Sequence, residues 1–323
     1  MSTKIEWTNE TWNPIIGCQK CSPGCNHCYA ERMAVRLAGN PKTSMDYSPV
    51  ITNGHWNGTT MLRTEVLKKP FSWKTPRMIF VVSMGDLFHE SVPFSWVDKV
   101  MTIIACNPQH TFQVLTKRPE IMKRWFDWQR PGWEDPGMRG PEAIRYYCWH
   151  NHGKKIKYGG FWPLKNLWLG VTCENQEQTD KRIPILLQIP AEKRFVSIEP
   201  MIGPISFRWA KWHPIKNTWH LDGLKQLDWV IVGGETGPGA RPMHPAWVTQ
   251  IREQCQESNT PFFFKSWGEW IPVTYVNGDR SYLNVTIGKN EFLFMDPPIN
   301  MIKSRRFQDY KHKLEGKEWR GMP

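Results

Sequence analysis

Short apolar runs alternate along this chain with polar turns and with stretches of helical periodicity. Each run spans four to six positions rich in β-branched, leucine or aromatic residues, which is typical of strands buried on both faces. The predicted strands cover residues 11–16, 78–83, 111–115, 167–171, 194–198, 229–232 and 261–264. Helical patterns occur at residues 29–38, 95–106 and 245–258. This alternation predicts an α/β fold with a parallel sheet, in the form of a partial or full β/α (TIM-like) barrel.

Two segments interrupt this rhythm. An aromatic and basic insertion is predicted at residues 120–166, after the third strand, and a C-terminal extension at residues 268–323. The extension carries β-like runs at residues 270–276, 282–287 and 291–295, which predict a β-rich tail. The barrel is therefore assigned to residues 1–119 and 167–267.

Polar, charged and turn-forming residues recur where the predicted strands end. Barrels and open α/β sheets place their sites at the carboxyl ends of strands, so these residues are the first candidates for chemistry. In chain order they are Ser83, Gly85, Asp86, Thr116, Lys117, Arg118, Thr172, Glu174, Asn175, Glu199, Glu235, Lys265 and Trp267.

Composition narrows the class of protein. Of the 323 residues, 40% are hydrophobic, enough for a large core, and no apolar run is long enough for a membrane span. The first residues lack the apolar core of a signal peptide, so cytoplasmic residence is expected. A formal net charge of +12 and 19 tryptophans favour an anionic partner such as a nucleotide or a nucleic acid, whose bases can stack on indole rings.

Four cysteines gather in one short loop at residues 18–28, which is typical of metal ligands in a reducing compartment. The spacing Cys21-x3-Cys25-x2-Cys28 is that of a [4Fe–4S] cluster with one iron free of protein ligands. That iron can chelate S-adenosylmethionine, and Tyr29 is then placed to lie against its adenine. Cys18-x6-Cys25-x2-Cys28 is a second triad. All four thiolates together would instead close a structural zinc site.

Several motifs resemble a phage-associated three-cysteine family of radical-SAM-like proteins, most of which have no assigned function. The resemblance is carried by IEWT at 5–8, TWNP at 11–14, SPGC at 22–25, CYAE at 28–31, SMGDLFHE at 83–90, QHTFQVLTKRP at 109–119, WLGV at 168–171, VIVGGE at 230–235, GPGARPM at 237–243 and PFFFK at 261–265. The resemblance implies a barrel of the radical-SAM type with Cys18, Cys25 and Cys28 as cluster ligands. Cys21 stands where the family commonly has an apolar residue, whereas the general radical-SAM spacing favours Cys21, so the first ligand stays open.

The resemblance also implies roles for the strand-end residues. In radical-SAM enzymes a glycine-rich turn after the second strand holds the amino group of the cofactor, which implies Ser83, Gly85 and Asp86 here, with Asp86 as the acceptor. Contact with the cofactor carboxylate is implied for Thr116, Lys117 and Arg118, and contact with the cofactor ribose for Thr172, Glu174 and Asn175. Catalysis is implied for Glu199, Glu235 and Lys265. Substrate binding is implied for Arg241 and Trp267.

The resulting expectation is an enzyme that cleaves S-adenosylmethionine to a 5′-deoxyadenosyl radical. The expected substrate is a nucleobase, a nucleotide or a nucleic acid, and the expected electron donor is a protein such as a flavodoxin or a ferredoxin. Two alternatives remain: a nucleic-acid-binding protein with a structural zinc site, and an iron–sulfur redox sensor without catalysis. The sequence leaves the identity of the substrate and the oligomeric state open.

Overall fold

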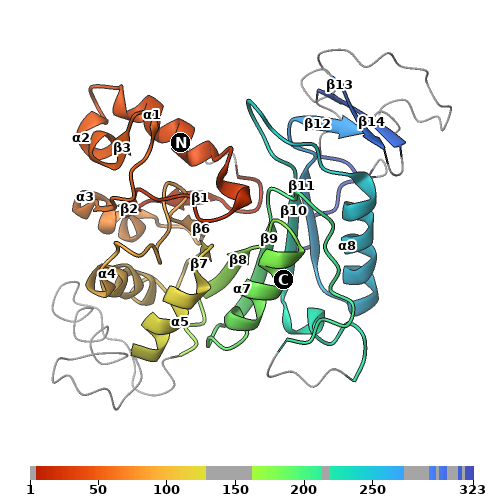
Figure 1. Cartoon of the computed structure of the whole chain (residues 1–323). Helices are drawn as coiled ribbons and strands as arrows, with labels where there is room; N and C mark the ends of the chain where they lie inside the picture. Colours follow the sequence, from red (N-terminus) through yellow and green to blue (C-terminus); the bar gives the residue numbers. More distant parts are fainter. Residues whose placement is uncertain are drawn as a thin grey trace. The chain divides into compact units, whose positions relative to one another are not determined.

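The structure is a computed structural model. It describes residues 5–128, 162–212, 218–272, 291–295, 298–303, 312–314 and 317–323. The chain divides into two compact units (Figure 1). The first unit comprises Met1–Cys21, Ala30–Val171 and Ile185–Arg194, and the second comprises Ser22–Tyr29, Thr172–Pro184 and Phe195–Pro323. The boundary falls inside the cysteine loop, so Cys18 and Cys21 belong to the first unit and Cys25 and Cys28 to the second.

The first unit is built on parallel strands: β1 (Glu10–Trp12), β6 (Met78–Val81), β7 (Thr111–Thr116) and β8 (Leu167–Thr172). Their register brings four side chains into one row across the sheet, because Trp12 pairs with Val81, Val81 with Val114, and Val114 with Leu169. All four are at most 1% exposed. The unbroken apolar runs of the sequence are thus explained by strands covered on both faces.

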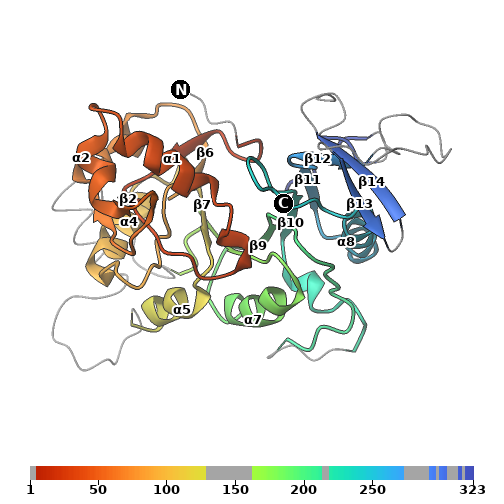
Figure 2. The same ribbon diagram turned by 45° about the horizontal axis from the view of Figure 1, so that its top comes forward.

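The second unit holds most of β9 (Lys193–Ile198) together with β10 (Trp229–Gly233) and β11 (Phe262–Ser266). These strands are also parallel, and Ile198 pairs with Val232, which pairs with Phe264. Helix α8 (Pro245–Ser258) packs against β11 (Figure 2). The C-terminal residues return to this strand, where the Gly321 amide donates to the Phe262 carbonyl. That pairing covers an edge of the sheet that would otherwise expose unpaired backbone groups.

The strand order of this sheet is β1-β6-β7-β8-β9-β10-β11. Each strand of the sheet therefore lies beside the sheet strand that comes before it in the sequence. Sequential order is that of a barrel, whereas doubly wound sheets reverse direction at a switch point. Because β1 and β11 are the two ends of the order, the barrel is partial. The predicted α/β fold with a parallel, barrel-type sheet is confirmed.

The remaining elements connect these strands. The larger helices are α1 (Tyr29–Ala38), α4 (Phe94–Ala105), α5 (Pro119–Trp128) and α7 (Gln176–Leu186). The short elements are β2 (Ile15–Ile16), η1 (Pro23–Cys25), α2 (Ser44–Tyr47), η2 (Ser48–Val50), β3 (Ile51–Thr52), β4 (His55–Trp56), β5 (Met61–Leu62), α3 (Thr64–Leu67), η3 (Lys69–Ser72) and η4 (Leu224–Gln226). No helix in the described ranges is long and apolar enough to cross a membrane.

The predicted strand at residues 11–16 is wrong in one respect, because the structure divides it into β1 and β2. Pro14 lies at the break and has no amide hydrogen to donate to a ladder. Its carbonyl accepts from the Arg63 amide, and β2 then pairs antiparallel with β5. This break turns the chain away from the main sheet just before the cysteine loop.

The β-rich tail is confirmed. Strands β12 (Trp270–Pro272), β14 (Pro298–Lys303) and β13 (Glu291–Met295) form a separate antiparallel sheet in that order. The predicted runs at 270–276 and 291–295 correspond to β12 and β13, whereas the run at 282–287 lies outside the described residues. Strand β14 was missed because it begins with proline and leads into a basic stretch. Of the predicted insertion, α5 and residues 162–166 are described, and residues 129–161 are not.

Gly17, directly before the first cysteine, allows a close approach that no other residue permits. It has φ of +95°, and a Cβ atom built on it would lie 2.2 Å from the Thr59 carbonyl oxygen. We therefore expect Gly17→Ala to destabilise the protein by roughly 3 kcal/mol or more, from overpacking combined with the left-handed backbone. Urea unfolding followed by circular dichroism measures this loss.

Gly54 is the matched control. It also has positive φ, +77°, but a Cβ atom there would meet nothing within 4 Å. Gly54→Ala should therefore cost only about 1 kcal/mol. Equal losses of unfolding free energy in the two variants would show that the contact with Thr59 does not contribute to the cost.

Candidate active site

The turn that follows β6 is strained and tightly packed. Val82 has φ of +64°, which is a genuine outlier for a β-branched residue, and it is 2% exposed. The Asn13 side chain accepts from the Met84 amide at 3.2 Å. A Cβ atom on Gly85 would lie 2.7 Å from the Gly17 carbonyl oxygen. Backbone strain of this kind costs about 1–3 kcal/mol and is concentrated at functional sites.

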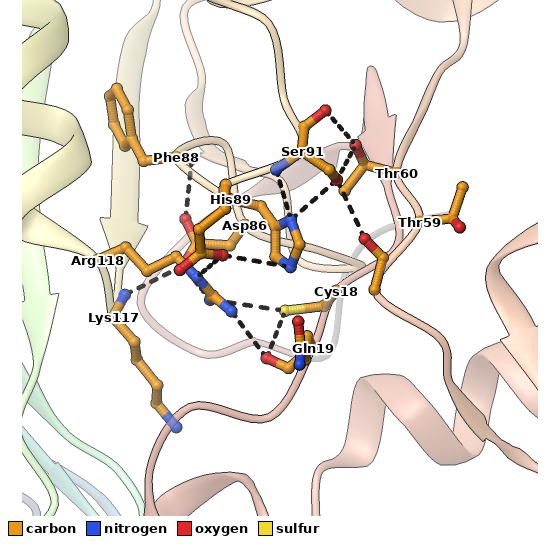
Figure 3. A network of polar contacts seen from close by, with 12 residues as sticks. Cys18, Gln19, Thr59, Thr60, Asp86, Phe88, His89, Ser91, Lys117 and Arg118 are labelled. Carbon is orange, nitrogen blue, oxygen red and sulfur yellow. Dashed lines mark hydrogen bonds and ion pairs between the residues drawn. The ribbon is translucent and has the colours of Figure 1, made fainter.

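The Asp86 carboxylate lies at the centre of a buried network in the first unit (Figure 3). One oxygen accepts from Thr116 Oγ1 at 2.7 Å and from the Phe88 amide at 3.0 Å. The other accepts from the Lys117 amide at 3.1 Å and from Arg118 Nη1 at 3.3 Å. A carboxylate offers about four acceptor positions, so these donors use all of them. The role of Asp86 as acceptor for a cofactor amine stays a prediction, and it requires one of these donors to give way.

Arg118 extends this network to the cysteine loop. Its Nε donates to Glu90 at 2.8 Å and its Nη2 to the Gln19 carbonyl at 2.9 Å, while Nη1 also lies 3.9 Å from Cys18 Sγ. Burial alone would lower the pKa of the guanidinium, but the charges of Asp86, the two cysteines of this unit and Glu90 raise it above its ordinary value. Arg118 is therefore a permanent cation beside the first cysteine.

His89 lies next to this network, on the loop between Asp86 and α4. Its Nδ1 lies 3.0 Å from the Ser91 hydroxyl, which also contacts Thr60 at 2.9 Å (Figure 3). Burial, and then the neighbouring Arg118, lower the pKa of His89. The imidazole therefore stays neutral at physiological pH and serves as a polar support for the Asp86 turn. Sequence reasoning did not assign this role, although His89 and Glu90 stand inside the 83–90 motif.

In the second unit, Glu174 holds the turn that contains Cys25. Its Oε1 accepts from the Gly24 amide at 3.1 Å and its Oε2 from Arg182 at 2.8 Å. Glu174 is fully buried, and Arg182 also donates to the Thr172 carbonyl at 2.7 Å. Sequence reasoning missed Arg182, since nothing local marks a helix residue as the partner of a strand-end carboxylate. Contact of Glu174 and Thr172 with a ribose stays a prediction.

Glu235 and Arg241 form a second support for the same turn. Arg241 donates to Glu235 through its amide, Nε and Nη2, at 2.6–2.9 Å, and Nη2 also donates to the Pro23 carbonyl at 3.0 Å. Burial would raise the pKa of Glu235, but the hydrogen bonds from Arg241 lower it overall. Gly239 approaches the His27 ring so closely that a Cβ atom would lie 2.7 Å from it.

The other predicted residues of the second unit have distinct surroundings. Glu199 and Lys265 form an ion pair and are each partly exposed, which suits groups that meet a substrate. Asn175 lies just before α7, where its Oδ1 accepts from the Gln178 amide at 3.0 Å, so it caps the helix. Trp267 is 1% exposed, and its Nε1 donates to the Lys313 carbonyl. Its ring belongs to the core, and its contact with a substrate stays a prediction.

None of the four cysteines of the loop is in a disulfide. Cys18, Cys25 and Cys28 are half-buried, whereas Cys21 is exposed, and the neighbouring Tyr29 is 48% exposed. Within the described ranges, no three histidine, cysteine or acidic side chains form a ready metal-ligand group. The donor set nevertheless fits an iron–sulfur cluster chemically, because cysteine thiolates are the usual cluster ligands and Cys18 lies 3.9 Å from Arg118, a fixed cation that favours a thiolate.

Comparisons with known proteins add a family but no assigned function. The family described as "Protein of unknown function (DUF5131)" matches residues 2–323. No curated protein matches the sequence. Among solved structures, a cysteine-to-serine mutant of spore photoproduct lyase is similar with a TM-score of 0.41 and 9% identity, over 96% of this chain and 73% of that one.

Glu174→Gln should destabilise the protein strongly. The substitution keeps the size of the side chain but leaves the Arg182 charge buried without its partner, which typically costs about 3–5 kcal/mol. The free energy of unfolding in urea tests this expectation. Glu192→Gln is the control, because its partner Lys165 is 83% exposed and such pairs contribute about 0–1 kcal/mol. Similar losses for both variants would contradict the importance of the buried pair.

Glu235 should make the stability depend on pH. Because its folded-state pKa is lowered, its contribution is present above the ordinary glutamate pKa of about 4.3 and is lost as the pH falls through the folded value. The free energy of unfolding of wild type should therefore fall more steeply than that of Glu235→Gln between about pH 5 and pH 3. Parallel pH profiles for the two proteins would refute this contribution.

Proposed function

We propose that this chain, which belongs to the DUF5131 family, is an iron–sulfur enzyme of the radical-SAM type acting on a nucleobase, nucleotide or nucleic-acid substrate. One observation carries the proposal: Arg118 joins Cys18 to the Asp86 turn at the carboxyl ends of the parallel strands β6 and β7. Parallel β/α folds place their chemistry at this edge. When bound, a [4Fe–4S] cluster and S-adenosylmethionine would supply an electron and a 5′-deoxyadenosyl radical.

The thiols would hold the cluster. Cys25 and Cys28 belong to both spacings found in the sequence, and Cys18 or Cys21 completes the set of three. Cys18 is favoured by its half-buried position beside Arg118, because a fixed cation stabilises a thiolate. The buried pair of Glu174 and Arg182 holds the backbone next to Cys25, so protein groups alone support this turn.

Polar side chains near the strand ends would recognise the other components. Lys117 is half-buried, and in Figure 3 its side chain extends away from Asp86, as a group that binds a cofactor carboxylate or a phosphate would. The pairs Glu199–Lys265 and Glu235–Arg241 offer both a carboxylate and a cation. The net charge of +12 favours an anionic substrate and an acidic electron donor such as a flavodoxin or a ferredoxin.

A structural zinc site in a nucleic-acid-binding protein is the second candidate. It rests on one observation, that none of the four cysteines of the loop is in a disulfide. Four thiolates would close the coordination sphere and leave no open position for chemistry. Metal analysis of the purified protein separates the candidates, since stoichiometric zinc in a colourless protein supports this one.

The proposed enzyme is tested by anaerobic reconstitution with iron and sulfide. Reconstituted wild type should be brown and should form 5′-deoxyadenosine from S-adenosylmethionine when dithionite is added, as measured by liquid chromatography with mass spectrometry. Cys25→Ala and Cys28→Ala should lose both the cluster and the product. A control reaction without S-adenosylmethionine is included, because 5′-deoxyadenosine formed in it would be an artefact.

Cys255→Ala is the matched cysteine control, because Cys255 is fully buried in α8 and should be dispensable for the cluster. A wild-type protein that binds the cluster but forms no 5′-deoxyadenosine would instead indicate the redox sensor. Absence of both cluster and product would refute the iron–sulfur proposal altogether.

A further inference from the structure

Arg118 makes contacts in three directions from one planar group. It donates to the Glu90 carboxylate. It also donates to the Asp86 carboxylate and the Gln19 carbonyl, with the Cys18 sulfur beside them (Figure 3). A guanidinium presents its donors in a rigid fork, so three acceptors bound to it are fixed relative to one another. A lysine ammonium at the same position would act as a point charge without this geometry.

The cysteine loop is tied to its surroundings at three consecutive residues. The Gly17 amide donates to the Met84 carbonyl at 3.1 Å, and the Gly58 amide donates to the Cys18 carbonyl at 3.2 Å. The third tie is the bond from Arg118 to the Gln19 carbonyl at 2.9 Å. The first two involve only backbone, so Arg118 supplies both a side-chain tie and a charge at this end of the loop.

Burial makes the arrangement rigid. The side chains of Arg118 and Asp86 are 6% and 7% exposed, so neither charge is well solvated outside the pair. Removing one partner leaves the other buried without compensation, which is strongly unfavourable. The more exposed Glu90 contributes less, because water screens its charge. The loop after β7, the turn after β6 and the cysteine loop are therefore coupled through one side chain.

We propose that Arg118 is a positioning residue that holds Cys18 and the Asp86 turn in one arrangement and places a fixed positive charge beside the cysteine loop. The proposal deepens the iron–sulfur function and rests on it only for the effect of this charge on a bound cluster. The positioning itself concerns the protein without cofactor. The donors of Arg118 bind protein groups in this structure, and its contact with a cofactor carboxylate stays a prediction.

Hydrogen exchange of the metal-free protein, measured by mass spectrometry, tests the positioning. In Arg118→Gln, peptides covering residues 17–21 and 84–90 should exchange about tenfold faster or more, because a charge-assisted tie is lost. Arg77→Gln is the matched control, since Arg77 pairs with Glu10 in the same unit at the opposite end of β6. Its exchange in these two peptides should equal that of wild type.

The reduction potential of the reconstituted protein tests the charge. A nearby cation favours the more negative reduced state, so Arg118→Gln should lower the potential, whereas Arg118→Lys should keep it near that of wild type. A purely structural role would not separate these two variants. The electron paramagnetic resonance spectrum of the reduced cluster provides a second signature, which should change in Arg118→Gln and not in Arg77→Gln.

The outcomes separate the proposal from the function on which it rests. Equal exchange in wild type and Arg118→Gln overturns the positioning role, whether or not a cluster binds. If circular dichroism shows that Arg118→Gln does not fold, Arg118→Lys is compared with wild type instead. Exchange in Arg118→Lys equal to that of wild type then overturns the role of the guanidinium geometry. If no variant binds a cluster, the iron–sulfur function fails while the exchange result still decides the positioning. Equal potentials in Arg118→Gln and Arg118→Lys overturn the charge effect.

Discussion

The buried carboxylate of Asp86 is the group on which the rest of the first unit's site depends. Four donors surround it, and they come from its own turn, from the last residue of β7 and from the loop after β7. Burying a carboxylate costs free energy unless its acceptor positions are used. Moving any one donor away would leave part of the charge without a hydrogen bond, so each donor is held in place. Thr116 and Arg118 take their positions from this one group, and Arg118 in turn ties down the cysteine loop.

The second unit repeats the same physical solution with other residues. Glu174 pairs with Arg182 and accepts from the Gly24 amide, while Arg241 pairs with Glu235 and donates to the carbonyl before Gly24. Each end of the cysteine loop is thus held, within its own unit, by a carboxylate that is neutralised by an arginine. The backbone around the cysteines is thus fixed by charge pairs rather than by disulfides.

The fold explains why these groups meet. In a sheet whose strands follow one another in sequence order, the carboxyl ends of neighbouring strands lie along one edge. Asp86 follows β6 and Arg118 follows β7, so the parallel pairing of these strands brings a carboxylate and a guanidinium together over 32 positions of sequence. The strained backbone at Val82 belongs to the same edge, where the Val82 side chain and the Gly17 carbonyl both lie close to Gly85.

The sequence by itself determined the apolar strands, the sequential α/β order and the cluster of thiols, because these features depend on the period of burial and on local spacing. Six of the predicted strands agree with the structure to within two residues, and the exception is broken by Pro14. Only the tertiary structure decided what each polar strand-end residue does. Asp86 is saturated with donors, Asn175 caps a helix and Trp267 belongs to the core. The reason is that hydrogen-bond partners and burial are set by which strands and loops become neighbours, and the local pattern of a sequence does not contain that information.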